Sequence, residues 1–163
     1  MSPGITFDAS IMPRRLAAHP LALALFTAPA ACGWIESEGR MRIESRFQPG
    51  EVIVSEPAAN YFGLESRGGG QSRGNGALVL TADQLWFHLL VPTQELTIRL
   101  ADVTDVALVD GHLGKSVGRA LLRVRFRGEA GEDAAAWLVA DPERWQREIA
   151  ARSGARPAPS PTD

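Results

Sequence analysis

Residues 76–90, GALVLTADQLWFHLL, carry the strongest structural signal in this chain. They form two short apolar runs that are separated only by Ala82 and Asp83. Two such runs joined by a tight turn are typical of an antiparallel β-hairpin. The stretch therefore predicts a hairpin in a β fold, with Trp86 and Phe87 among the core residues.

Further short apolar runs lie on both sides of this hairpin. Residues 95–100 (ELTIRL) and 120–127 (ALLRVRFR) alternate between apolar and polar side chains, which is the period of a half-buried strand. The remaining strands are expected at 51–55, 60–64, 103–109 and 135–139. Because no helical segment separates these runs, they indicate a mainly β fold, an antiparallel barrel or sandwich, rather than a parallel sheet.

One helix is predicted, at residues 142–152. Asp141 is suited to accept N–H bonds as the N-cap, and Pro142 suits the first helical position. Trp145 and Ile149 are four residues apart and form a narrow apolar stripe. The sequence thus predicts that a terminal helix packs against the sheet through these two side chains.

Three segments together resemble the pleckstrin-homology-like (PH-like) superfamily, in particular its GRAM and bacterial PH-type branches. They are GALVLTADQLWFHLL, ELTIRLADVTDVAL and AAWLVADPERWQREI, and the resemblance covers roughly residues 47–151. It implies a strongly bent antiparallel barrel of about seven strands, whose open end is plugged by a C-terminal helix carrying Trp145 and Ile149. Domains of this superfamily bind phosphoinositides, phosphopeptides or other proteins. The first turn offers only Arg67 and Arg73, without a lysine cluster, so specific phosphoinositide binding is not expected.

The 163 residues are enough for one folded domain with extensions at both ends. We expect an N-terminal extension at 1–40, poorly ordered or helical, a PH-like domain at 41–153 and a disordered Pro-rich tail at 154–163. The apolar run 16–26 follows two arginines, and the extension has three interpretations: a segment upstream of a start near Met41, a secretory leader, or a degenerate membrane anchor. The first is favoured, because the run is interrupted and too short to span a bilayer.

The composition excludes several classes of protein. A single cysteine rules out a disulfide scaffold, and a net charge of -2 is not that of a general nucleic-acid binder. Three scattered histidines and no close acidic cluster do not supply four metal ligands at workable spacing. We therefore expect no metal, no cofactor and no nucleic-acid partner.

The segment GKSVG, residues 114–118, matches the G-x-S-x-G pattern around a nucleophilic serine. That serine needs a helix after it and a histidine later in the chain, whereas here a strand follows and the last histidine is His112. We therefore expect a protein that is not an enzyme. A small hydrolase using Ser116 or His88 is the less favoured alternative.

Basic residues are concentrated in the second half of the chain. Between Asp110 and Glu129 there is no acidic residue, and the two-residue period of a strand places Arg123, Arg125 and Arg127 on one face. This stripe has two interpretations. It contacts an anionic membrane or an acidic partner, or its arginines pair with carboxylates close in the chain, namely Asp102, Asp105 and Asp110.

The sequence thus favours a non-catalytic binding or scaffolding module, cytoplasmic or associated with a membrane, that recognises a protein partner or an anionic lipid surface. A secreted or membrane-anchored form of this module is the alternative. We expect contact through the loops 67–73 and 112–119 and the arginine strand beside them. The residues of this surface are Arg67, Arg73, His112, Lys115, Arg119, Arg123, Arg125 and Arg127.

Overall fold

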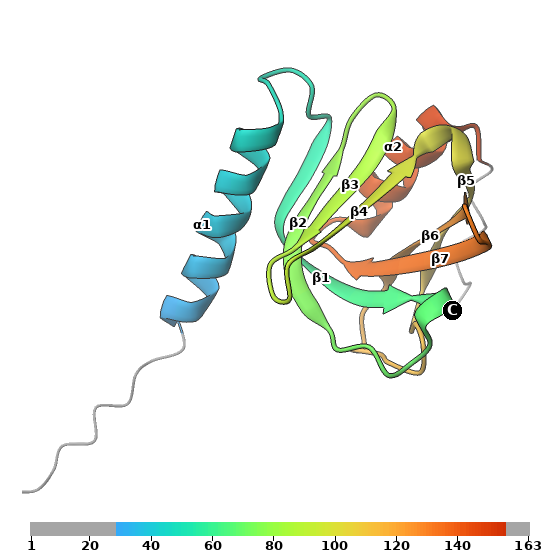
Figure 1. Cartoon of the computed structure of the whole chain (residues 1–163), viewed down its shortest axis with the longest axis horizontal. Helices are drawn as coiled ribbons and strands as arrows, with labels where there is room; N and C mark the ends of the chain where they lie inside the picture. The colour runs from blue at the N-terminus through green and yellow to red at the C-terminus, as the bar shows by residue number, and fades with distance from the viewer. Residues whose placement is uncertain (1–28, 156–163) are drawn as a thin grey trace, which may run out of the picture.

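The computed structural model describes residues 29–155 (Figure 1). The predictions of a leader or anchor within 1–28, and of a disordered tail from 156 onward, fall on residues outside the described range. The strands are β1 (Val54–Leu64), β2 (Gly74–Leu80), β3 (Gln84–Leu89), β4 (Gln94–Arg99), β5 (Val103–Val109), β6 (Leu121–Gly128) and β7 (Gly131–Leu138). The helices are α1 (Pro29–Arg46) and α2 (Pro142–Ser153), with 3-10 turns η1 (Glu65–Arg67) and η2 (Leu100–Asp102).

The seven strands within the described residues form one sheet in the order β4-β3-β2-β1-β7-β6-β5, and every neighbouring pair is antiparallel. The sheet bends, so that its two halves enclose the core while α2 closes one end (Figure 1). The predicted mainly β fold with a C-terminal helix is thereby confirmed. The sheet is not a fully closed barrel, because its edge strands β4 and β5 do not pair.

The strands expected at 51–55 and 60–64 are parts of one continuous strand, β1, which begins only at Val54. Pro57 lies where its pairing with β2 shifts register, between Glu56 and Ala59, so the missing N–H of proline is accommodated at an irregularity. A second shift towards β7 falls between Tyr61 and Gly63, where Gly63 has φ of 116°. These irregularities allow β1 to take part in both halves of the bent sheet.

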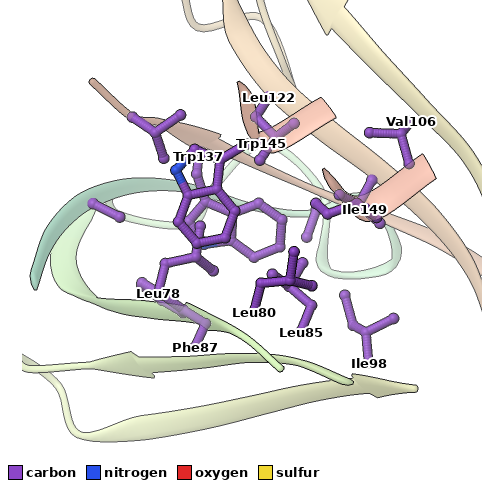
Figure 2. Packing of buried hydrophobic residues seen from close by; sticks show 14 of the residues in the cluster. Leu78, Leu80, Leu85, Phe87, Ile98, Val106, Leu122, Trp137, Trp145 and Ile149 are labelled. Atoms are coloured by element: carbon purple, nitrogen blue, oxygen red, sulfur yellow. The ribbon is translucent and has the colours of Figure 1, made fainter. Parts of the chain in front are cut away.

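The core is built around the α2 residues Trp145 and Ile149, which are 2% and 0% exposed. Asp141 accepts a hydrogen bond from the Arg144 N–H at 2.9 Å, as expected of an N-cap. Figure 2 shows the two α2 side chains packed beside Trp137, and the whole cluster comprises side chains from both halves of the sheet. Phe87 belongs to this cluster.

Trp86 is also buried, but on the other face of the sheet. Its neighbours in a separate apolar cluster are Phe47, Ala77 and Val79, and Phe47 contacts it edge-on with ring centroids 5.3 Å apart. Helix α1 lies along this outer face, beside β1 and β2 (Figure 1). The boundary expected at residue 41 therefore falls inside a continuous helix that packs on the sheet.

Helix α1 approaches β1 closely at Gly39. A Cβ atom at this position would collide with the carbonyl oxygen of Pro57, so only glycine allows the helix to lie at this distance. Gly33 lies nearer the start of the same helix, and a Cβ atom added there would have no neighbouring atom within 4 Å.

No helix in residues 29–155 combines the length and the apolar composition needed to cross a membrane.

Replacing Trp145 by alanine should lower the free energy of unfolding by about 3–5 kcal/mol, because it leaves a large cavity in the core. Trp34, whose exposure is 56%, provides the matched control: Trp34→Ala should change stability by about 0.5 kcal/mol or less. Urea denaturation followed by circular dichroism measures both. Equal losses in the two variants would contradict the proposed role of Trp145 in the core.

The two glycines of α1 should respond in opposite ways to alanine. Gly33→Ala should stabilise the protein by up to about 1 kcal/mol through helix propensity. Gly39→Ala should destabilise it and make α1 more susceptible to limited proteolysis, because the new methyl group displaces the helix from Pro57. If Gly39→Ala is as stable and as protease-resistant as Gly33→Ala, α1 does not pack at this distance.

Candidate binding surface

The two loops expected to form the contact surface lie side by side. The ammonium group of Lys115, in the loop between β5 and β6, donates to the carbonyl oxygens of Gln71 and Phe62. The Gln71 side chain in turn accepts from the Leu64 N–H at 3.1 Å and donates to the Leu64 carbonyl at 2.7 Å. The β1–β2 and β5–β6 loops are therefore held against each other by hydrogen bonds from Lys115 to residues far away in the sequence.

His112 is part of this bracing and is not available on the surface. It is 5% exposed, and its Nε2 donates to the carbonyl oxygen of Gly63 at 3.1 Å. Burial lowers the pKa of His112, against the opposing effects of the Gly63 carbonyl and the charge of Glu65. Of the expected contact residues, His112 and Lys115 are thus committed to holding the loops.

The arginine strand is only partly a free basic stripe. Arg123 lies 3.6 Å from Asp105, one of the carboxylates expected as partners, and Arg125 lies 3.9 Å from Glu65. Their side chains are 26% and 35% exposed. Directly opposite them on β7 are alanines 136 and 134, whose small side chains leave room for the arginine stems on the sheet surface.

Arg127 differs from these two. It is exposed at the end of β6, and no ion pair of Arg127 occurs within residues 29–155. The stripe therefore combines two half-buried, paired arginines with one that is open to solvent.

One cleft is lined by Arg119 and by Asn60, the side chain to which Arg73 donates. Arg73 donates to the side-chain oxygen of Asn60 at 3.0 and 2.7 Å, and its guanidinium lies 4.5 Å from the centre of the Phe62 ring. Asn60 donates to Asn75 at 2.7 Å, and both amides line a cleft of about 490 Å³ together with exposed Arg119. The asparagines were not among the expected site residues, because only the pairing of β1 with β2 places them together.

Arg67 lies apart from that cleft. It donates to the side chain of Gln94 at 3.0 Å and lines a cavity of only about 50 Å³ with Tyr61. Burial raises the pKa of Tyr61 to about 12, which the charge of Arg67 partly counteracts and that of Asp133 reinforces. The phenol therefore stays neutral at ordinary pH, and the cavity has little room for a ligand.

Ser116 and His88, the residues of the alternative hydrolase hypothesis, each contact other residues of the fold. The Ser116 hydroxyl donates to the carbonyl oxygen of Asp110 at 2.6 Å, and strand β6 follows this loop. His88 stacks on Trp86 with ring centroids 5.7 Å apart, and its Nδ1 lies 3.4 Å from Glu95. Neither side chain is paired with the other in the described part of the chain.

The carboxyl group of Glu95 is an acceptor for two ring N–H groups. Partial burial acts to raise its pKa, but hydrogen bonds from Trp86 and His88 and the charge of Arg46 hold it below the usual value.

Within residues 29–155, no group of three or more histidine, cysteine, aspartate and glutamate residues is arranged to hold a metal ion.

Comparison with known proteins does not assign this chain to a family. No protein-family model matches this chain, and no curated protein matches it. Among solved structures, a similar chain is the C-terminal domain of an unknown protein from Leishmania infantum. The two share 9% identity with a TM-score of 0.46, over 75% of this chain and 97% of the other.

His112, which helps to hold the two loops together, makes the free energy of unfolding depend on pH. Because the pKa of His112 is lower in the folded state than its ordinary value of 6.5, the unfolded chain binds the proton more readily. The contribution of His112 to the free energy of unfolding is therefore complete above pH 6.5. It is lost as the pH falls from 6.5 towards the lower pKa that His112 has in the folded protein.

We expect His112→Gln to lose less stability than the wild type between about pH 7.5 and 5.5, measured by urea denaturation at both values. The other histidines are present in both proteins, so their titration cancels in the comparison. Parallel pH profiles for the two proteins would contradict the assignment of a lowered pKa to His112.

Proposed function

We propose that this chain is a non-catalytic binding module related to the PH-like superfamily, and that it recognises an acidic group of a protein partner in the cytoplasm. The observation that carries the proposal is the cleft lined by exposed Arg119, Asn60 and Asn75, in which the Asn60 side chain also accepts from Arg73. The bent sheet and the buried Trp145 of α2 support the kinship, since both were expected from the resemblance.

The chemistry of this cleft suits a carboxylate or a phosphate group. Guanidinium and amide N–H groups donate to both, and charge-assisted hydrogen bonds are the stronger ones. Arg73 does not line the cleft, but it holds the Asn60 side chain in place, so little side-chain freedom of Asn60 is lost when a ligand binds. Arg119 is exposed and has no ion pair within the described residues, which leaves its charge available to a partner.

A protein partner fits this surface better than a membrane does. Polybasic segments bind anionic lipids through uncompensated charges, each worth about 1 kcal/mol. Here Glu56 lines the same cleft, and Arg123 and Arg125 are partly neutralised by carboxylates. Interspersed charges of both signs favour recognition of a complementary protein surface.

Arg119→Gln should weaken capture of the partner from extracts of the native cells by roughly fivefold or more, because it removes a charge-assisted contact. Arg147→Gln is the matched control, since Arg147 is an exposed arginine on α2, outside the cleft. The captured proteins are compared quantitatively by mass spectrometry. A set of captured proteins that is the same for Arg119→Gln and wild type would overturn the proposal.

The membrane alternative is tested with the same variants. The full chain is mixed with vesicles of phosphatidylcholine alone or with added phosphatidylglycerol, at about 0.15 M salt. We expect no excess cosedimentation with the anionic vesicles. An excess that Arg119→Gln abolishes and Arg147→Gln retains would assign the cleft to lipid and contradict the protein-partner proposal.

A further inference from the structure

The two edges of the sheet are treated differently by the fold. At the β5 edge, α2 packs alongside the strand, and the Gln146 side chain donates to the carbonyl oxygen of Val106 at 3.1 Å. The β4 edge has no such cover among residues 29–155, where β4 pairs only with β3. A strand edge without cover is a template for another strand.

The hydrogen-bond pattern identifies which residues of β4 present their backbone groups outward. In an antiparallel pair, opposed residues alternate between those that exchange hydrogen bonds and those that do not. The Leu100 N–H donates to the carbonyl of its opposed residue, Asp83, at 2.8 Å. By alternation, Ile98, Leu96 and Gln94 bond to β3.

Strand β3 gives the same result from its other side. The Thr81 N–H donates to Gln84, which places Gln84, Trp86 and His88 in hydrogen-bonded pairs with β2. The residues between them on β3 therefore bond to β4, in agreement with the first assignment. The N–H and C=O groups that point away from the sheet belong to Glu95, Thr97 and Arg99.

These three residues form a self-complementary set. If a second copy of β4 pairs with the first in antiparallel orientation, with a twofold axis at Thr97, then Thr97 faces Thr97 of the other copy. Glu95 then faces Arg99 at both ends. The same residues that face each other also carry the outward backbone groups, so register and charge favour one arrangement.

Charges on an exposed edge normally oppose pairing between copies. Here the pattern has the opposite effect, because the facing charges differ in sign, and cross-strand pairs of opposite charge are stabilising. Arg99 already binds Asp102 at 2.6 and 3.1 Å and still has further N–H groups to donate. The Glu95 side chain is 47% exposed and so remains accessible.

There is also room for a strand beside this edge. Thr97, Ile98 and Arg99 line a cleft of about 750 Å³ whose other wall is the end of β6 and the turn after it, including Phe126 and Arg127. No described segment fills that cleft. A neighbouring backbone can therefore approach the outward groups of Thr97 and Arg99 without displacing any described part of the fold.

We propose that the β4 edge is a homodimer interface, in which β4 of a second copy of this chain pairs antiparallel about Thr97 and joins the two sheets into one. This inference goes beyond the proposed function and does not depend on it. A dimer would present two of the clefts lined by Arg119, and so would bind a multivalent partner more tightly than a monomer.

The test measures the oligomeric state of the full chain by analytical ultracentrifugation, up to roughly 100 μM, which suits a small interface. We expect a concentration-dependent dimer. Thr97→Pro should raise the dissociation constant by about tenfold or more, because it removes an outward N–H while leaving the β3–β4 bonds intact. Thr97→Val, which keeps the N–H, should still dimerise.

A charge exchange gives a second test that does not depend on proline being tolerated. Glu95→Arg and Arg99→Glu should each weaken the dimer by about tenfold, since like charges then face each other twice. The double variant should restore dimerisation, although it does not restore the native contacts of Glu95 with His88 or of Arg99 with Asp102. Rescue therefore reports pairing between copies.

A monomer at all concentrations overturns the proposal, as does a dimer that is insensitive to Thr97→Pro and to the single charge variants. Amide hydrogen exchange provides the direct check in the wild type. The Thr97 amide should be protected at concentrations where the dimer forms and unprotected in the monomer. The Leu96 and Ile98 amides, which bond to β3, should be protected in both.

Discussion

The contact between α2 and the inside of the bent sheet constrains the rest of the molecule. Trp145 and Ile149 are almost fully buried among side chains from both halves of the sheet, beside Trp137. A sheet bent this strongly would expose apolar side chains at its open end, and the helix covers them because hydrophobic burial is the main favourable term in folding. The position of α2 also decides which edge is protected, since Gln146 reaches β5 and leaves β4 uncovered.

The outer face of the sheet serves different purposes on its two sides. On β2 and β3 it is apolar and is covered by α1, where Gly39 permits close approach. On β6 and β7 it combines half-buried arginines with alanines, and hydrogen bonds from Lys115 and His112 fix the neighbouring loops. Several of the basic side chains expected to contact a partner therefore make contacts within the protein instead. The arginines available to a partner are those without such contacts.

Local patterns were sufficient where one element decides its own structure. The strand expected at 103–109 is β5, and the helix expected at 142–152 is α2, because apolar periodicity and helix capping are properties of short segments. Residues 1–40 were expected to be poorly ordered or helical, but the continuation of helix α1 to Arg46 and its packing on the sheet were not expected. The division of β1 into two runs was wrong because proline at an irregular position does not end a strand.

Sequence patterns alone were enough to predict the class of fold, the alternation of buried and exposed positions along β4 and β6, and the burial of Trp145. They were enough because these features depend on side chains two to four residues apart. Three relations came from the three-dimensional structure alone: Arg119 shares a cleft with two asparagines, Arg125 lies near Glu65, and the β4 edge is open within residues 29–155. Such relations join segments far apart in the chain. A periodic pattern predicts which side chains lie on one face of a strand, but it does not predict which other strand lies beside it.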